Sequence, residues 1–328
     1  MSILSTGVLA GTPVVLAPMS GITDLPFRRL VRSFGVDMVV SEMIASVGLA
    51  KGSRESRERG ALDAREQPKV IQLAGCEPEA MRHAAKVAEE MGADIVDINM
   101  GCPMKKVVTG YAGSALMRDE ANALRIIDAT VAGTSRPVTL KMRTGWDHAS
   151  RNAPALAAKA EASGVQAIAV HGRTRCQFFT GQADWQFIRE IKARVSVPVV
   201  ANGDLNTLED ARAMLAQSGA DGVMIGRGAF GRPWFPAQVR QYLATGERLA
   251  NPPMPEQRRI VGEHYEAMLE YYGRERGVRI ARKHFNAYLE RIGIDKPARQ
   301  QVLRLETPAA VHEALDRIYD AAAQSWAA

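Results

Sequence analysis

The residues with the clearest chemical potential lie in one short stretch, residues 97–103 (DINMGCP), which is followed by Lys105 and Lys106. An apolar run ends here, so a strand is expected to deliver an Asn, a flexible Gly and a Cys to a loop, where functional residues concentrate. Free cysteine more often behaves as a small buried hydrophobe. The adjacent Gly, Pro and lysines indicate a loop at the end of a strand, so at this point Cys102 is either a thiol that takes part in chemistry or a small buried side chain.

Other polar side chains also follow short apolar runs, and they would converge if the carboxyl ends of parallel strands opened onto one face. A Lys buried at the end of an apolar strand is costly unless an anion pairs with it, so Lys141 indicates a negatively charged ligand. Glycines at 203, 226 and 228 would let backbone N–H groups approach a phosphate. Taken singly, each polar residue also has an ordinary structural explanation; together they favour a site for a phosphate-bearing cofactor. The set is Gln72, Asn99, Cys102, Lys141, Arg143, His171, Asn202, Asp204 and Arg227.

These residues must be positioned by the apolar runs that precede them. The runs are continuous rather than alternating, which is typical of parallel strands buried on both faces. With helical patterns between them, they predict an α/β fold, a (β/α)8 TIM barrel. The eight predicted strands lie at residues 14–17, 38–40, 70–73, 95–98, 138–141, 167–171, 197–201 and 222–225, and the helices begin with one capped by Asp24 and continue at 79–91, 114–132, 154–163, 184–194 and 208–218.

A doubly wound open sheet is the alternative fold. Residues 226–231 (GRGAFG) formally match the GxGxxG fingerprint after a strand. No further strand pattern follows to complete a βαβ unit, and a Gly-rich phosphate site after the last barrel strands explains the match better.

The pattern changes near residues 251–255, which are rich in proline. We predict a barrel domain over residues 1–245, a linker over 246–255 and a small all-helical domain over 256–328, with helices at 256–272, 278–292, 300–305 and 308–323. Between residues 274 and 283, five basic side chains accompany a single Glu275. A solvated helix face is the usual explanation, and contact with a phosphate backbone is the sharper one.

Composition sets further bounds. Lys and Arg outnumber Asp and Glu by 42 to 36 in 328 residues, which permits a polyanionic partner without proving one. The three cysteines are far apart, so no disulfide framework or iron–sulfur site is indicated, and the six histidines show no metal-ligand spacing. We therefore expect no metal. Without a targeting signal or a long apolar run, the expectation is a cytoplasmic protein with no membrane partner.

Several motifs together resemble the tRNA-dihydrouridine synthases, and most closely their bacterial B-type subgroup. The motifs are residues 17–24 (APMSGITD), 97–103 (DINMGCP), 140–146 (LKMRTGW), 171–174 (HGRT), 201–204 (ANGD) and 279–284 (RIARKH). The resemblance covers essentially the whole chain.

The resemblance implies an FMN-binding barrel with a helical RNA-binding domain, which reduces the C5–C6 double bond of selected uridines in tRNA with NADPH. Hydride would pass from N5 of reduced FMN to uracil C6, and Cys102 would donate the proton to C5. A thiol with an ordinary pKa near about 8.5 is mostly protonated at neutral pH, so it would act as an acid. The implied FMN contacts are Pro18, Met19, Ser20, Gln72, Asn99, Lys141, His171, Asn202, Gly203, Asp204, Gly226 and Arg227, and the implied tRNA contacts are Lys105, Lys106, Arg143, Arg173, Arg175, Arg279, Arg282 and Lys283.

Three hypotheses therefore stand. The first is reduction of tRNA uridines by a monomeric flavoenzyme. The second is an FMN barrel that reduces a free pyrimidine or another small enone and would not need the helical domain. The third is a non-catalytic RNA-binding module with a vestigial barrel. Bound flavin and a dihydrouridine product distinguish the first.

Overall fold

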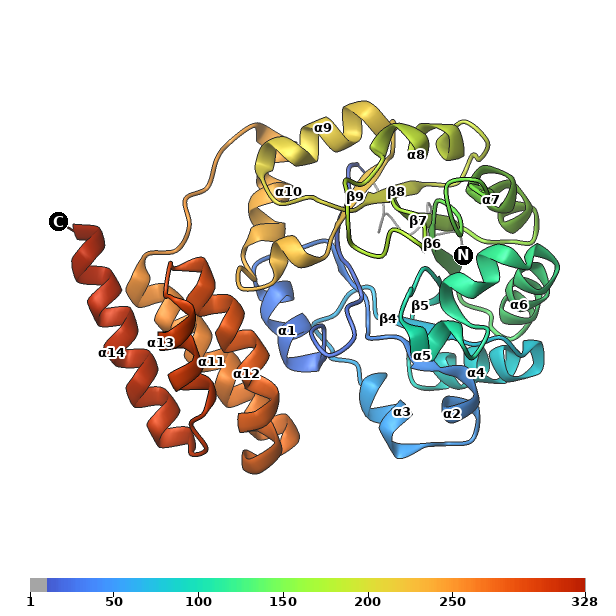
Figure 1. The fold of residues 1–328 in the computed structure, drawn as a ribbon. Coiled ribbons are helices and arrows are strands. Elements are labelled where there is room, and N and C mark those ends of the chain that lie inside the picture. Colours follow the sequence, from blue (N-terminus) through green and yellow to red (C-terminus); the bar gives the residue numbers. More distant parts are fainter. Residues whose placement is uncertain (1–10, 328) are drawn as a thin grey trace. The chain divides into compact units, whose positions relative to one another are not determined.

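The computed structural model describes residues 11–327, with side chains to residue 324. Residues 1–10, on which the predicted lack of a targeting signal and the start of the predicted barrel domain depend, lie outside the described residues. The chain divides into two compact units (Figure 1). One runs to Gly228 and includes Pro236–Gly246, and the other comprises Ala229–Phe235 and the chain from Glu247 onward.

All strand pairs of the first unit are parallel, and the strand order is β2-β1-β9-β8-β7-β6-β5-β4-β3. Strands β2 and β3 are two short pieces of one stretch, which closes the ring between β1 and β4. The predicted eight-stranded barrel is confirmed, and the open-sheet alternative was wrong. The strands are β1 (Val14–Leu16), β2 (Met38–Val39), β3 (Ile44–Ala45), β4 (Val70–Ala74), β5 (Ile95–Met100), β6 (Val138–Arg143), β7 (Ala167–His171), β8 (Val199–Asn202) and β9 (Gly222–Ile225).

Helices surround this ring in Figure 1, as the alternation of apolar runs and helical patterns predicted. Asp24 caps the first helix, because its Oδ1 accepts the Phe27 N–H at 3.1 Å. The helix predicted over 114–132 is broken at Asp119, whose side chain caps the second part. The helices are α1 (Leu25–Ser33), α2 (Ser46–Ala50), α3 (Arg54–Arg59), α4 (Pro78–Glu90), α5 (Lys105–Val108), α6 (Glu120–Ala132), α7 (Ala153–Ala162), α8 (Trp185–Lys192), α9 (Leu208–Ser218) and α10 (Phe235–Thr245), with 3-10 turns η1 (Gly113–Arg118) and η2 (Arg227–Ala229).

Apolar side chains fill the barrel interior. Strand side chains alternate between the two faces, so every second residue points inward and the others pack under the helices. The inward apolar cluster is Val15, Ala17, Met38, Val40, Val70, Ile95, Ala167, Ala169, Val200 and Met224. Asp97 and Thr139 are the polar side chains that lie beside this cluster, and they are bonded to each other at 2.5 Å.

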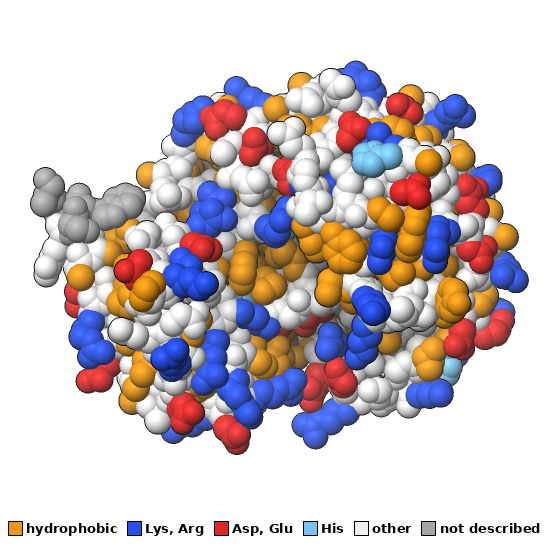
Figure 2. All heavy atoms as spheres, viewed as in Figure 1, with side chains coloured by type: hydrophobic (Ala, Val, Ile, Leu, Met, Phe, Trp, Pro, Cys, Tyr) orange, Lys and Arg blue, Asp and Glu red, His pale blue; other side chains and the backbone are white. Residues whose placement is uncertain are grey.

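The second unit is built from α11 (Met254–Tyr272), α12 (Arg274–Arg291), α13 (Lys296–Leu303) and α14 (Pro308–Ala327). Tyr265, Phe285 and Leu315 are among the buried residues of its core. Gly277 allows α11 and α12 to pack closely, since a Cβ there would lie 3.0 Å from the backbone of Leu269. In Figure 2, Lys and Arg side chains gather over the surface of these helices. No helix in the described part of the chain has the length and apolar character that a membrane span requires.

Candidate active site

A cavity of about 320 Å³ opens at the carboxyl ends of the barrel strands, a volume that suits a small molecule or cofactor. The predicted catalytic thiol and every predicted cofactor contact lie on its wall. The predicted residues found there are Pro18, Met19, Ser20, Gln72, Asn99, Cys102, Lys141, Arg143, His171, Asn202, Gly203, Asp204, Gly226 and Arg227.

Strand register explains why these polar side chains meet. Lys141 of β6 is in register with Asn99 of β5. Two residues further on, Arg143 is in register with His171 of β7, which pairs with Asn202 of β8. Because residues two apart share a face of the strand, these side chains point to the same side of the sheet. They form a polar layer at the mouth, beyond the apolar cluster of the interior.

A directional chain of hydrogen bonds runs from Asp97 to the backbone of Cys102. Gln72 Nε2 donates to Asp97 Oδ2 at 2.6 Å, and Asn99 Nδ2 donates to Gln72 Oε1 at 2.8 Å. Asn99 Oδ1 then accepts the Cys102 N–H at 2.9 Å. Asp97 accepts from Gln72 at Oδ2 and from Thr139 at Oδ1, while burial raises the pKa of this carboxyl group. These two contacts set which end of each amide faces which neighbour. The chain thereby fixes the loop that carries the thiol.

Two buried cations, Lys141 and Arg143, also line the cavity. Lys141 Nζ donates to Asn202 Oδ1 at 3.1 Å, and among the described residues no carboxylate lies within ion-pair distance of it. Burial, with the Arg143 charge nearby, lowers the pKa of Lys141 to about 8. Arg143 Nε donates to the Gly101 carbonyl at 2.7 Å, and burial together with Arg173 lowers its pKa to about 10. Cations held in this way favour an anionic ligand.

The opposite pKa shift affects the thiol of Cys102. Burial raises the pKa of Cys102 above that of an ordinary thiol, while Arg143 and Lys141 act in the other direction. The thiol is therefore protonated at neutral pH and lies near positive charges that would stabilise its thiolate. A group of this kind can donate a proton and hold the resulting negative charge.

His171 is neutral at the mouth, because burial and then the surrounding cations hold its pKa well below 6.5. Arg173 Nη1 lies 3.3 Å from His171 Nε2, and a guanidinium only donates, so the imidazole proton belongs on Nδ1. Gly203 has φ +117°, and a Cβ there would come within 2.8 Å of the His171 ring. Asp204 accepts from Arg173 at 2.6 Å and from Arg227 at 3.2 Å.

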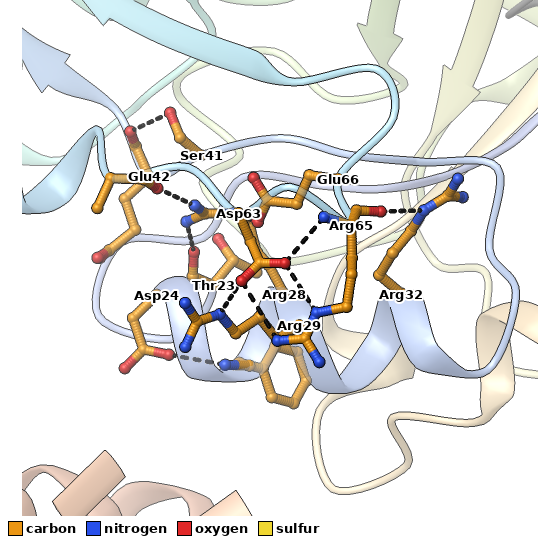
Figure 3. Close-up of polar contacts among 12 residues, drawn as sticks. Thr23, Asp24, Arg28, Arg29, Arg32, Ser41, Glu42, Asp63, Arg65 and Glu66 are labelled. Carbon is orange, nitrogen blue, oxygen red and sulfur yellow. Dashed lines mark hydrogen bonds and ion pairs between the residues drawn. The ribbon is translucent and has the colours of Figure 1, made fainter. Parts of the chain in front are cut away.

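Hydrogen bonds to Thr23 and Glu42 anchor the loop that carries Met19 and Ser20. Figure 3 shows Thr23 and Glu42 with Arg28 and Glu66. The Met19 N–H donates to Thr23 Oγ1 at 2.8 Å, and the Gly21 N–H donates to the Glu42 carboxylate. Arg28 Nη1 donates to the Thr23 carbonyl at 3.0 Å, and Arg28 Nε is paired with Glu66 at 2.9 Å. This buried ion pair ties the start of α1 to the segment before β4.

The remaining predicted substrate contacts lie elsewhere. Lys105 and Lys106 are exposed on α5, and Arg175 stacks over Trp146 with 4.6 Å to the ring centroid. Arg173 is only 2% exposed and donates to two backbone carbonyls besides Asp204. In the second unit, all on α12, Arg279 is exposed, whereas Arg282 and Lys283 are half-buried. Their contacts with tRNA stay a prediction.

Sequence reasoning missed some residues of the wall, notably Met43, Met104 and Phe179. Phe179 is 45% exposed, and the guanidinium carbons of Arg143 and Arg227 lie 5.5 and 5.3 Å from its ring centroid. It also missed the role of Asp97. An acidic residue in the middle of an apolar strand was the available signal, since such a group needs buried partners.

Fold and site together define a (β/α)8 enzyme whose cavity combines a protonated thiol with cations. The family model "Dihydrouridine synthase (Dus)" matches residues 15–324. The chain therefore belongs to the dihydrouridine synthase family, a family of flavin-dependent oxidoreductases, and the predicted family is confirmed.

Similar proteins support this family assignment. A "Probable tRNA-dihydrouridine synthase" of Rickettsia conorii is 52% identical over 307 residues, 93% of each chain. One of Rhodobacter capsulatus is 53% identical over 91% of this chain and 92% of its own. A "tRNA-dihydrouridine synthase B" of Pseudomonas aeruginosa is 48% identical over 89% and 88%.

Among solved structures, a 2-naphthoyl-CoA reductase in complex with 2-naphthoyl-CoA superposes with a TM-score of 0.56 at 12% identity. The match covers 70% of this chain and 50% of that one. At this identity the likeness shows the barrel fold alone.

Proposed function

We propose that this protein reduces the C5–C6 double bond of specific uridines in tRNA to 5,6-dihydrouridine, with FMN as cofactor and NADPH as reductant. The reaction class, reduction of uridines in tRNA, follows from family membership. The observation that carries the detailed proposal is the cavity that joins the Cys102 thiol to Lys141 and Arg143. Cytoplasmic conditions, which keep thiols reduced, suit the three free cysteines, and we expect the enzyme to act as a monomer.

The donor set of the cavity fits FMN. Within the described part of the chain Lys141 Nζ donates only to Asn202, which leaves ammonium protons for an anionic acceptor. Arg227 is largely exposed at the mouth, next to Gly226 on the cavity wall, and suits a phosphate group. When bound, FMN would supply the hydride for uracil C6. The residues that would hold it are Pro18, Met19, Ser20, Gln72, Asn99, Lys141, His171, Asn202, Gly203, Asp204, Gly226 and Arg227.

Cys102 acts in this proposal as the general acid. Its Sγ–H bond breaks as the proton passes to C5 of the uracil, where negative charge develops when C6 is reduced. The resulting thiolate is stabilised by Arg143 and Lys141 and takes a proton back from solvent. The chain from Asp97 to Cys102 holds the backbone of the acid in place while this happens.

Basic side chains supply the contacts with the tRNA phosphates. Lys105 and Lys106 are exposed next to the loop that carries Cys102, and Arg175 is half-buried on the loop that follows β7. A uridine in folded tRNA must leave its stack to reach the cavity, and phosphate contacts offset part of that cost. Arg143 and Arg173 would contact the tRNA at the mouth of the barrel. On α12, the proposed contacts are Arg279, Arg282 and Lys283.

The test is the dihydrouridine content of tRNA from cells that lack this protein, mapped nucleotide by nucleotide. The strain is complemented with the wild type or with Cys102→Ala. We expect loss at defined positions that only the wild type restores. If dihydrouridine is unchanged and no second enzyme covers those positions, tRNA is not the substrate. The purified flavoprotein would then be assayed with free pyrimidines.

A further inference from the structure

Tyr111 is an exposed aromatic residue on a strained backbone. Its side chain is 72% exposed, and its φ is +55°. Positive φ is an outlier for a bulky residue, which Gly or Asn would adopt more easily. Strain of this kind persists mainly at functional sites.

The turn around Tyr111 is held rigidly against the catalytic loop. The Tyr111 N–H donates to the Val108 carbonyl at 3.0 Å. Ser114 donates to the Cys102 carbonyl twice, from its N–H at 3.1 Å and from its Oγ at 2.8 Å. A Cβ on Gly113 would lie 2.9 Å from the same carbonyl oxygen. Since two residues span at most about 7 Å, Tyr111 stands within one nucleotide's reach of the Cys102 loop.

The surroundings of Tyr111 carry both apolar surface and positive charge. Met104 is 52% exposed and lines the cavity. Lys105 and Lys106 are exposed on α5, and no described carboxylate forms an ion pair with either. Proteins that bind single-stranded nucleic acid combine these same features, aromatic rings on which bases stack and cations that follow the backbone.

We propose that Tyr111 stacks on the unpaired base of tRNA that neighbours the uridine in the cavity, while Lys105 and Lys106 bind the flanking phosphates. The inference rests on the proposed function and names a part of its substrate site. A uridine that leaves its stack exposes a face of the adjacent base. Because hydrogen bonds fix the backbone of this turn, Tyr111 loses little backbone freedom when the base binds.

The experiment compares Tyr111→Phe, Tyr111→Ala and Tyr111→Gly in the full-length protein loaded with its flavin. Affinity for an unmodified tRNA transcript and the rate of dihydrouridine formation are measured, together with the melting temperature and the rate of flavin reduction by NADPH. We expect the Ala and Gly variants to bind tRNA about five- to a hundredfold more weakly, the usual effect of losing one stacked base. The Phe variant keeps the ring and stays within about twofold of the wild type.

Stability separates a binding role from a structural one. Tyr111→Gly relieves the positive φ, so its melting temperature is expected to be no lower than that of the wild type. Flavin reduction by NADPH is expected to be unchanged in all three variants. Lys105→Gln and Lys106→Gln should each reduce the slope of log affinity against log salt by about one.

A direct readout uses 2-aminopurine placed on either side of a uridine that the wild type reduces. Quenching on one side should persist in Tyr111→Phe and disappear in Tyr111→Ala. If the wild type modifies tRNA and Tyr111→Ala binds it equally well, the inference alone is overturned. A parallel loss of melting temperature and flavin reduction in Tyr111→Ala would mean a structural role instead. If the wild type does not act on tRNA at all, the inference and the proposed function both fail.

Discussion

The mouth of the barrel and helix α12 both gather positive charge, but they hold it differently. At the mouth, Lys141 and Arg143 are buried and bonded to fixed oxygen atoms, and the pKa of each is lowered. On α12, Arg279 is exposed and forms an ion pair with Glu275, one turn away. A buried charge interacts strongly with nearby groups because the effective dielectric constant around it is low. An exposed charge interacts weakly because water and salt screen it.

The difference indicates a division of roles. Buried cations beside a thiol can stabilise charge that forms at one atom, which is useful for a chemical step. Exposed cations on a helix attract any polyanion without favouring one geometry, which is useful for holding a large substrate. Substitutions at the mouth should therefore change reactivity or cofactor binding, and substitutions on α12 should change affinity and its salt dependence.

The largest effect is expected for Cys102→Ala. Removal of a general acid typically lowers a rate by about 10²- to 10⁴-fold. Single-turnover formation of dihydrouridine in a tRNA transcript should fall by this amount, while tRNA affinity changes little. The wild-type proton transfer should also fail as the pH rises through the raised pKa of the thiol, because only the protonated form donates. A rate that Cys102→Ala leaves intact would remove the thiol from the mechanism.

Lys141→Met tests whether a buried cation holds the cofactor. A hydrogen bond to a charged group is worth about 1.5–3 kcal/mol, so FMN affinity at pH 7 should fall about ten- to a hundredfold. Above pH 8 the wild type should lose about tenfold in affinity per pH unit, because Lys141 then binds FMN only after taking up a proton. Flavin fluorescence titrations between about pH 7 and 9.5 measure both effects. A variant with the wild-type pH profile would show that another group is responsible.

Gln72→Glu tests the hydrogen-bond chain by changing one amide into an acid. A protonated carboxyl group at this position can still donate to Asp97, but two ionised carboxylates cannot share the 2.6 Å contact. The folded variant therefore keeps a proton that the unfolded chain loses above about pH 4.3. Its stability should fall by about 1.4 kcal/mol for each pH unit above that value, until the pair ionises.

Activity of Gln72→Glu should fall relative to the wild type only at the pH where the folded pair loses its shared proton, because the donor to Asp97 is then gone. Unfolding in urea at several pH values and single-turnover rates measure the two effects. Gln72→Met is the matched control, since it breaks the chain at every pH and introduces no titrating group. If the Glu and Met variants show the same pH dependence, the hydrogen-bond chain does not depend on a donor at position 72.

The sequence predicted the barrel because each strand is a continuous apolar run. It also predicted most of the cavity wall, because a closed parallel barrel brings all the strand ends to one face. Gln72, Lys141, His171 and Asn202 could be named for this reason alone. To predict that these residues line the cavity, it was enough to know the order of the strands and which residues face inward. No side-chain contact had to be known.

What the sequence could not predict depends on register and on contacts distant along the chain. Asp97 looks like an ordinary interruption of a strand until β4, β5 and β6 are aligned, when it meets Gln72 and Thr139. Arg173 looks like a free cation until its guanidinium is found bonded to Asp204. The split of one barrel strand into β2 and β3 also left no signal in the apolar pattern.

The smallest effect is expected on α12, and Arg279→Gln measures it. Arg279 and Glu275 form an exposed pair one turn apart, and Arg317 with Glu313 on α14 forms another, so Arg317→Gln is a matched control. Exposed pairs contribute less than about 1 kcal/mol, so neither change should lower stability appreciably. Loss of one phosphate contact should weaken tRNA binding only a few-fold and reduce the salt slope by about one for Arg279→Gln alone. Equal slopes in both variants would mean that α12 does not bind tRNA through Arg279, and would leave Arg282 and Lys283 as the candidates on this helix.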